Sequence, residues 1–306
     1  MEINITMSTD DNYCMHACSL IMSILENSGK DYYKFYIFYS NSGLSKRNRD
    51  YLIKFFKDNN CKLIFKEIDK EIFSGLTCPI AHISEAANYR IASFEMIPED
   101  RVIYLDLDMI VLSDIKKLFN FKIGNSVLGA VSDYAMGLFS RRKYFNSGML
   151  LVDLKKWREQ KYSEKVISYM RNNDGLLGCP DQDALNYVLK NDWVSLPLKF
   201  NRQKIVYELK AKDMSISKSL RKELLNKPAI IHYTGPIKPW HFRYVFPDKS
   251  KYIKNIKKTK WKNEINKDFS VKNCFFFLCR YATYKLMLRR KFEDRLLYLA
   301  KLFRLT

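Results

Sequence analysis

Strand and helix patterns alternate along the first part of the chain, and this alternation leaves few classes of fold open. Residues 2–8, 34–40 and 62–68 carry the alternating, apolar and aromatic residues of strands. Residues 14–28 and 45–60 lie between them and are predicted to be helices. The alternation predicts an α/β fold with a mainly parallel sheet and helices on both faces. Ligands of such sheets bind at the carboxyl ends of the strands.

An acidic pair follows a further predicted strand at residues 101–105. This apolar run is typical of a buried strand, and it ends at Asp106 and Asp108. Side chains two residues apart on a strand point to the same face, so both carboxylates are expected to face one space. Two like charges there repel and lose hydration, and a divalent cation such as Mg²⁺ or Mn²⁺ would relieve both costs. The alternative is a strand end with two solvated aspartates.

The second half of the chain continues the pattern. Residues 127–133, 144–154 and 229–233 are predicted strands, and 180–190 is a predicted helix. The acids in the first turn of that helix, taken alone, are explained by helix capping. No Gly-x-Gly-x-x-Gly or P-loop pattern is present, so any phosphate must be held in another way.

The end of the chain is strongly basic. Residues 249–306 hold 17 Lys and Arg against four acidic residues, which places +13 of the net charge of +20 in this segment. We therefore divide the chain into a catalytic domain at 1–247 and a basic, aromatic tail at 248–306. Residues 284–303 are predicted to form an amphipathic helix. Its apolar stripe comprises Leu288, Phe292, Leu296, Leu299 and Phe303.

This tail indicates an anionic partner, either a membrane surface or nucleic acid. We favour an anionic membrane surface; the alternative is a helix docked on the catalytic domain by its apolar stripe. The seven cysteines show neither zinc spacing nor a disulfide framework, which favours free thiols in a reducing compartment. No signal sequence or apolar stretch of about 18 residues is found. We expect a cytoplasmic protein, held peripherally on the inner face of the cytoplasmic membrane.

Six segments, in this order, resemble the retaining glycosyltransferases of family eight, which include glycogenin and bacterial lipopolysaccharide α-galactosyl- and α-glucosyltransferases. The resemblance spans about the first 240 residues and implies a GT-A fold, a UDP-sugar donor and a metal ion, Mn²⁺ or Mg²⁺. The segments are STDDNY at 8–13, HISEAANYR at 82–90, YLDLDMIV at 104–111, YFNSGMLLVDLKKW at 144–157, PDQDALN at 180–186 and HYTGPIKPWH at 232–241.

The resemblance assigns the base and the sugar of the donor to two groups of residues. Asp10 and Asn12 would hold the uracil, and Tyr13 would stack on it; the alternative for Tyr13 is ordinary core packing. Sugar hydroxyls need paired donors and acceptors, which the second group supplies. That group, lining the donor-sugar pocket, comprises Arg90, Asp133, Asn146, Asp181 and Gln182.

The resemblance also implies the residues that bind the metal and the diphosphate. Asp106, Asp108 and His232 would be the metal ligands, a set that suits Mn²⁺ better than Ca²⁺. Gly235 would let the backbone approach a phosphate, and Lys238 would place a positive charge on the diphosphate. The alternatives are a structural histidine on an apolar strand and one more solvated lysine in a basic chain.

The implied reaction moves a hexose, glucose or galactose, from UDP to a hydroxyl of a saccharide or lipid-linked glycan, and retains the α configuration. Gln182 would lie below the anomeric carbon, with Asp181 and Asp133 as further candidate catalytic residues. An amide oxygen is a poor nucleophile, so we favour attack from the face of the leaving group. Gln182 would then stabilise the cationic sugar.

Two other classes of function remain open at this point. An aspartate-dependent phosphotransferase of the haloacid dehalogenase type would place its acidic motif on the first strand, followed by a small residue and Thr. Here the motif lies a hundred residues into the chain and is followed by Met109 and Ile110. A module that binds nucleic acid through its tail has no recognised binding motif to support it, so nucleic acid is not expected as a partner.

Overall fold

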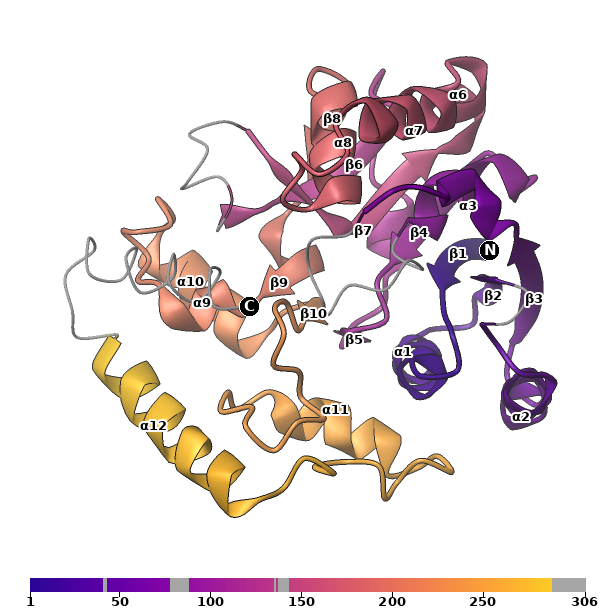
Figure 1. Ribbon diagram of the computed structural model, residues 1–306. Helices are drawn as coiled ribbons and strands as arrows, with labels where there is room; N and C mark the ends of the chain where they lie inside the picture. The colour runs from indigo at the N-terminus through magenta and orange to yellow at the C-terminus, as the bar shows by residue number, and fades with distance from the viewer. Residues whose placement is uncertain (41–42, 78–87, 135, 137–142, 288–306) are drawn as a thin grey trace.

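The structure is a computed structural model that describes the chain apart from residues 41–42, 78–87, 135, 137–142 and 288–306 (Figure 1). A seven-stranded sheet in the order β3-β2-β1-β4-β7-β6-β8 forms its centre. Its strands are β1 (Glu2–Ser8), β2 (Tyr32–Ser40), β3 (Cys61–Ile68), β4 (Arg101–Leu105), β6 (Leu128–Ser132), β7 (Phe145–Asp153) and β8 (Trp193–Ser195).

The sheet is mainly parallel, as predicted, with one reversed strand. β1 lies between β2 and β4 and is parallel to both, and β3 is parallel to β2. β7 runs antiparallel to both of its neighbours, β4 and β6. Because of this reversal, the start of β7 lies beside the carboxyl end of β4, at the edge where ligands are expected.

Helices cover both faces of the sheet. One core lies between the sheet and the pair α1 and α2, and the other between the sheet and α3, α6, α7 and α8 (Figure 1). Residues of β4 alternate between the two cores, with Ile103 in the first and Val102 in the second. The helices are α1 (Cys14–Glu26), α2 (Lys46–Phe56), α3 (Tyr89–Met96), α4 (Lys116–Phe119), α6 (Leu154–Glu159), α7 (Tyr162–Asn172), α8 (Pro180–Val188), α9 (Ile205–Glu208) and α10 (Lys218–Asn226).

The helix predicted at 45–60 is too long. α2 begins after Ser45, whose hydroxyl accepts a hydrogen bond from the backbone of Asn48, and ends at Phe56. The chain uses residues 57–60 to turn, since β3 begins at Cys61. The predicted strands, in contrast, agree with the observed ones to within two residues.

A second, smaller sheet completes the site. It contains β5 (Met109–Val111), β10 (Ile230–His232) and β9 (Arg202–Gln203), in the order β5-β10-β9. β10 is antiparallel to β5 and parallel to β9, so that His232 pairs with Met109 on one side and with Gln203 on the other. This pairing brings residue 232 next to the acidic pair that precedes β5.

The first part of the basic tail packs on the body of the protein. α11 (Lys249–Ile256) lies against α1, with the side chain of Tyr252 fully buried. Asp248 forms a buried ion pair of 2.7 Å with Arg202 of β9. These contacts cross the boundary that we predicted at Pro247, and the division there remains a prediction.

α12 (Val271–Met287) lies at one end of the molecule (Figure 1). Tyr284 packs edge-on against Phe246, while Phe275 and Leu278 are exposed. The helix predicted at 284–303 is present as far as Met287, and the rest of it, with the five residues of its apolar stripe, lies outside the described residues. No helix among the described residues is both long and apolar enough to cross a membrane.

Candidate active site

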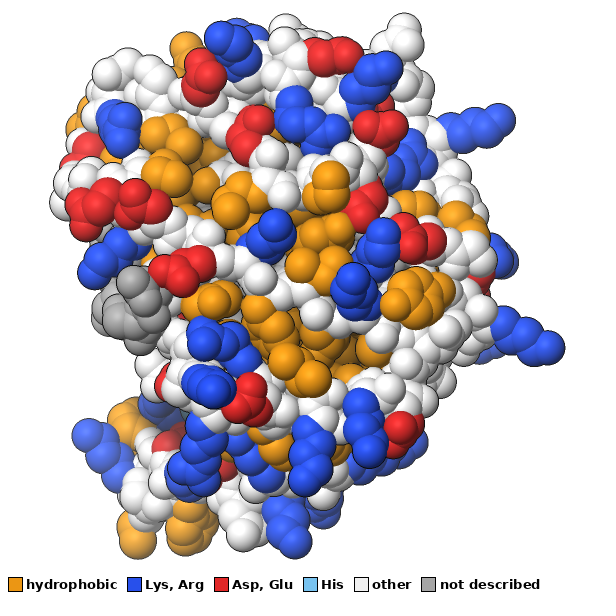
Figure 2. Space-filling model, turned by 90° about the vertical axis from the view of Figure 1, so that its right-hand side faces the viewer, with side chains coloured by type: hydrophobic (Ala, Val, Ile, Leu, Met, Phe, Trp, Pro, Cys, Tyr) orange, Lys and Arg blue, Asp and Glu red, His pale blue; other side chains and the backbone are white. Residues whose placement is uncertain are grey.

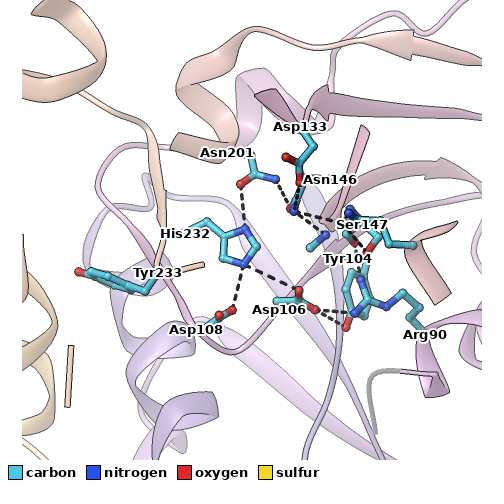
Figure 3. A network of polar contacts seen from close by, with 12 residues as sticks. Arg90, Tyr104, Asp106, Asp108, Asp133, Asn146, Ser147, Asn201, His232 and Tyr233 are labelled. Atoms are coloured by element: carbon cyan, nitrogen blue, oxygen red, sulfur yellow. Dashed lines mark hydrogen bonds and ion pairs between the residues drawn. The ribbon is translucent and has the colours of Figure 1, made fainter. Parts of the chain in front are cut away.

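Asp106 and Asp108 lie in the turn between β4 and β5, at the carboxyl edge of the sheet. The Asp106 backbone N–H donates to the carbonyl of Gly148 in β7 over 2.8 Å, which fixes the start of the turn. His232 Nε2 lies 3.2 Å from Asp108 Oδ1 and 3.9 Å from Asp106 Oδ2 (Figure 3). One ligand atom from each of the three residues falls within 4.8 Å of the others. The residues predicted to bind a metal therefore converge on one point.

A second contact orients the imidazole of His232. Its Nδ1 lies 3.0 Å from Asn201 Oδ1, and the Asn201 amide donates to Asn146 Oδ1 over 2.9 Å (Figure 3). An amide oxygen accepts a hydrogen bond, so Nδ1 carries the proton and Nε2 presents its lone pair to the two carboxylates. This is the tautomer that a metal ligand needs.

Cations accompany both carboxylates. Arg90, which is buried, lies 3.0 Å from Asp106 and 3.3 Å from Asp181. Lys238 Nζ lies 2.5 Å from Asp108 Oδ2 and donates to the carbonyl of Tyr233. Burial alone would raise the pKa of Asp108, but the ammonium group of Lys238 holds it well below its usual range. Asp108 is therefore ionised and able to bind a cation at neutral pH.

The residues present fit a small divalent cation. Two carboxylate oxygens and one imidazole nitrogen form a donor set that suits Mn²⁺, and Mg²⁺ accepts the same carboxylates. Gly148 faces this point: a Cβ at this residue would lie 2.6 Å from Asp106 Oδ2 and 2.5 Å from His232 Cε1. The site therefore needs a glycine there, since any side chain would displace a ligand.

A second polar cluster joins the start of β7 to the start of α8. Asn146 Nδ2 donates to Asp133 Oδ2 over 3.1 Å and to Gln182 Oε1 over 3.2 Å. The Ser147 backbone N–H also donates to Gln182 Oε1, over 2.9 Å. Burial raises the pKa of Asp181 above its usual range, and Arg90 opposes that rise. The five residues predicted to line a sugar pocket thus lie in one network beside the acidic pair.

The residues predicted to hold a base lie at the start of α1. Asp10 Oδ1 accepts a hydrogen bond of 2.8 Å from the Tyr13 backbone N–H, while Asn12 is exposed. The half-buried Tyr13 ring meets Trp240 edge-on, with 6.2 Å between ring centroids. Burial raises the pKa of Tyr13 to about 12, with a further contribution from Asp108. Tyr13 therefore lies within electrostatic range of the acidic pair.

Several further residues of this site carry no recognisable signal in the sequence. Asn201 orients His232, Ser147 contacts Gln182, and Tyr104 donates to Asp106 over 2.8 Å. Asn201 precedes a strand of only two residues and gives no periodic signal. Tyr104 lies in the predicted buried strand, and its hydroxyl reaches the acidic pair because it lies on the same face as Asp106.

Fold and site together define a class of protein. A mainly parallel sheet with one reversed strand, covered by helices on both faces, is the fold of a GT-A glycosyltransferase. The solved structure of the galactosyltransferase LgtC in complex with donor and acceptor sugar analogs has this fold. It matches with a TM-score of 0.74 and 24% sequence identity, over 86% of this chain and 100% of that one.

Sequence comparisons give the family. The family model for glycosyl transferase family 8 matches residues 4–243. General stress protein A of Bacillus subtilis is 31% identical over 273 residues, which cover 85% of this chain and 94% of that protein. The lipopolysaccharide 1,2-glucosyltransferase of Escherichia coli K12 is 28% identical over 282 residues, covering 87% and 81%. The chain belongs to glycosyl transferase family 8, which decides against the phosphotransferase alternative.

Proposed function

We propose that this glycosyltransferase moves glucose or galactose from a UDP-sugar to a saccharide hydroxyl, with retention of the α configuration, and that it requires Mn²⁺ or Mg²⁺. The proposal is carried by one observation, the convergence of Asp106, Asp108 and His232 within 4.8 Å. Arg90 connects this point to Asp181 and so to the sugar cluster. A diphosphate at the first group and a hexose at the second would be neighbours, as they are in a UDP-sugar.

Different residues would bind the base and the diphosphate of the donor. Asp10, Asn12 and Tyr13 would hold the uracil, and Gly235 and Lys238 would bind the diphosphate. A bound Mn²⁺ or Mg²⁺ would supply positive charge to the leaving diphosphate. Lys238 would add its own charge there, after exchanging Asp108 for a phosphate oxygen.

The sugar would react on one face. The bond from the anomeric carbon to the diphosphate breaks, the acceptor oxygen bonds to the same face, and a phosphate oxygen takes the acceptor proton. Gln182 Oε1 is held by Asn146 and Ser147. A fixed amide oxygen stabilises a cationic sugar without forming a bond to it. Asp181 and Asp133 complete the polar lining of the pocket.

The proposed setting is lipopolysaccharide or other surface glycan assembly, on a saccharide or lipid-linked acceptor at the inner face of the cytoplasmic membrane. Lys and Arg side chains gather on the lower part of the face in Figure 2. Phe275 and Leu278 of α12 are 65% and 59% exposed, beside the basic residues Lys272 and Arg280. Exposed apolar side chains next to basic ones suit an anionic membrane surface.

The experiment that tests the activity measures UDP release from UDP-glucose and UDP-galactose with a panel of saccharide acceptors. We expect release from one of the two donors with Mn²⁺ or Mg²⁺ and its loss in EDTA. Release that is equally fast in EDTA would contradict the metal requirement. Release only from donors other than UDP-hexoses would contradict the donor class.

A further inference from the structure

Lys204 stands at the same edge of the small sheet as the predicted diphosphate residues. β9 ends at Gln203, which pairs with His232 at the end of the parallel strand β10. The residues that follow two parallel strands leave the sheet at the same edge. Lys204 follows β9 as Tyr233 to Gly235 follow β10, so both segments project beyond the metal ligand His232.

The contact between the two segments is close. Gly235 has a φ of +83°, and a Cβ built on it would lie 2.8 Å from Lys204 Nζ and 3.3 Å from Lys204 Cε. The ammonium group therefore lies over the Gly235 backbone, in space that a side chain would fill. Glycine serves two purposes here, the left-handed backbone and the room for Lys204.

The charges around Lys204 favour an anion. Lys204 is only 6% exposed, and within the part of the chain that the structure describes its Nζ is in no ion pair. Lys238 and Arg280 are the nearby cations that disfavour its charge, and Glu208 is the nearby anion. Burial lowers the pKa of Lys204, and Glu208 opposes that shift. A phosphate or carboxylate oxygen at Lys204 would relieve the excess of positive charge.

We propose that Lys204 binds an anionic oxygen of a substrate at the Gly235 edge and so helps to select the substrate. The inference rests on the proposed function, because that function places a diphosphate at Gly235. The oxygen belongs either to the diphosphate of the donor or to a phosphate or carboxylate carried by the acceptor. Both sources offer the same chemistry, and direct binding measurements separate them.

The test is isothermal titration of wild type, Lys204→Met and the exposed neighbour control Lys212→Met, in the presence of Mg²⁺. Methionine keeps the apolar stem of Lys204 and removes its charge. If the donor supplies the oxygen, Lys204→Met weakens UDP binding by about tenfold or more and leaves uridine binding unchanged. If the acceptor supplies it, UDP binding is unchanged, and inorganic phosphate binds the UDP-saturated wild type but not the variant.

The inference is overturned if Lys204→Met binds both UDP and inorganic phosphate as the wild type does. It is also overturned if Lys212→Met produces the same loss, because the effect would then be general electrostatics. Failure of the proposed function would give a different result from failure of this inference. A wild type that binds inorganic phosphate through Lys204 but does not bind UDP supports the anion site and contradicts the UDP-sugar assignment.

Discussion

Asp108 contacts both His232 and Lys238 and is a predicted metal ligand. We expect Asp108→Ala to lower transfer by at least about 1,000-fold while the protein still folds. The folded state persists because Lys238 keeps its hydrogen bond of 2.9 Å to the carbonyl of Tyr233. Turnover with Mn²⁺ and thermal unfolding measure the two effects. Asp100→Ala, an exposed residue before β4, is the control, and near-normal turnover of Asp108→Ala would refute the metal assignment.

Gln182 acts through its amide oxygen, which Asn146 and Ser147 hold in place. We expect Gln182→Ala to retain some activity but to lower kcat by about 100-fold, because it removes electrostatic stabilisation and no bond-forming group. Steady-state kinetics measure the loss. A hexose attached covalently to Gln182 or to a neighbouring Asp would contradict this electrostatic role. Mass spectrometry of the protein during turnover would detect it.

His16 gives the protein a dependence of stability on pH. Its ring stacks on Trp240 and lies 2.5 Å from the Tyr252 hydroxyl, and burial lowers its pKa from 6.5 to about 3. Between these values the unfolded chain binds a proton that the folded protein does not, so stability falls as the pH falls. From pH 7.5 to 5 the loss from this group is about 2 kcal/mol. Over the same pH range, the free energy of unfolding of His16→Phe, measured with urea, should fall by about 2 kcal/mol less than that of the wild type. An identical fall in both proteins would contradict a lowered pKa for His16.

At the scale of the elements, the pairing of β4 with β7 and of β5 with β10 builds the metal site. Gly148 lies where these pairings meet. We expect Gly148→Ala to weaken Mn²⁺ binding, measured by electron paramagnetic resonance, by about tenfold or more, because its Cβ would displace His232 or Asp106. Gly178→Ala is the control, since a Cβ there meets only Asp183 Oδ2, at 3.8 Å. Equal affinity in both variants would show that the site tolerates the added methyl group.

Helices and strands with a periodic apolar pattern could be predicted from the sequence, and very short strands without such a pattern could not. The strand at 101–105 and the acidic turn after it follow from an apolar run and its sudden end. The convergence of His232 on that turn depends on the three-residue strands β5 and β10, whose pairing no local pattern encodes. β9 has two residues, so Asn201 and Lys204 on either side of it were not recognised. The family resemblance, not the periodicity, pointed to His232.

The charge of the tail did not reveal that its first helix, α11, packs on the catalytic body. Its composition is dominated by Lys and Arg, which suggested a segment separate from the catalytic domain. Tyr252 and Ile256 are nevertheless fully buried, and Asp248 pairs with Arg202 inside the protein. Two buried apolar side chains on one helix face and one buried ion pair are enough to hold α11 on the body, whatever the charge of its other face.

At the scale of the whole molecule, these contacts show where a truncation would test the proposed membrane attachment without removing α11 from the catalytic body. A chain that ends at Ser270 keeps α11 and loses α12 and the residues after it. We expect it to retain transfer to a soluble acceptor and to lose most of its sedimentation with anionic vesicles, since each Lys or Arg near such a surface contributes about 1 kcal/mol. Vesicles of neutral lipid are the control. Sedimentation equal to that of the full chain, with the same salt dependence, would exclude this segment as the anchor.

The site formed by Asp106, Asp108 and His232 is proposed to serve a retaining transfer from a UDP-hexose. The most direct test is proton NMR of the product formed from UDP-glucose or UDP-galactose with Mg²⁺ and a saccharide acceptor. The account predicts consumption of one donor and a new anomeric proton with the small coupling constant of an α-linked hexose. A β-linked product, or consumption of neither donor while both bind, would contradict it.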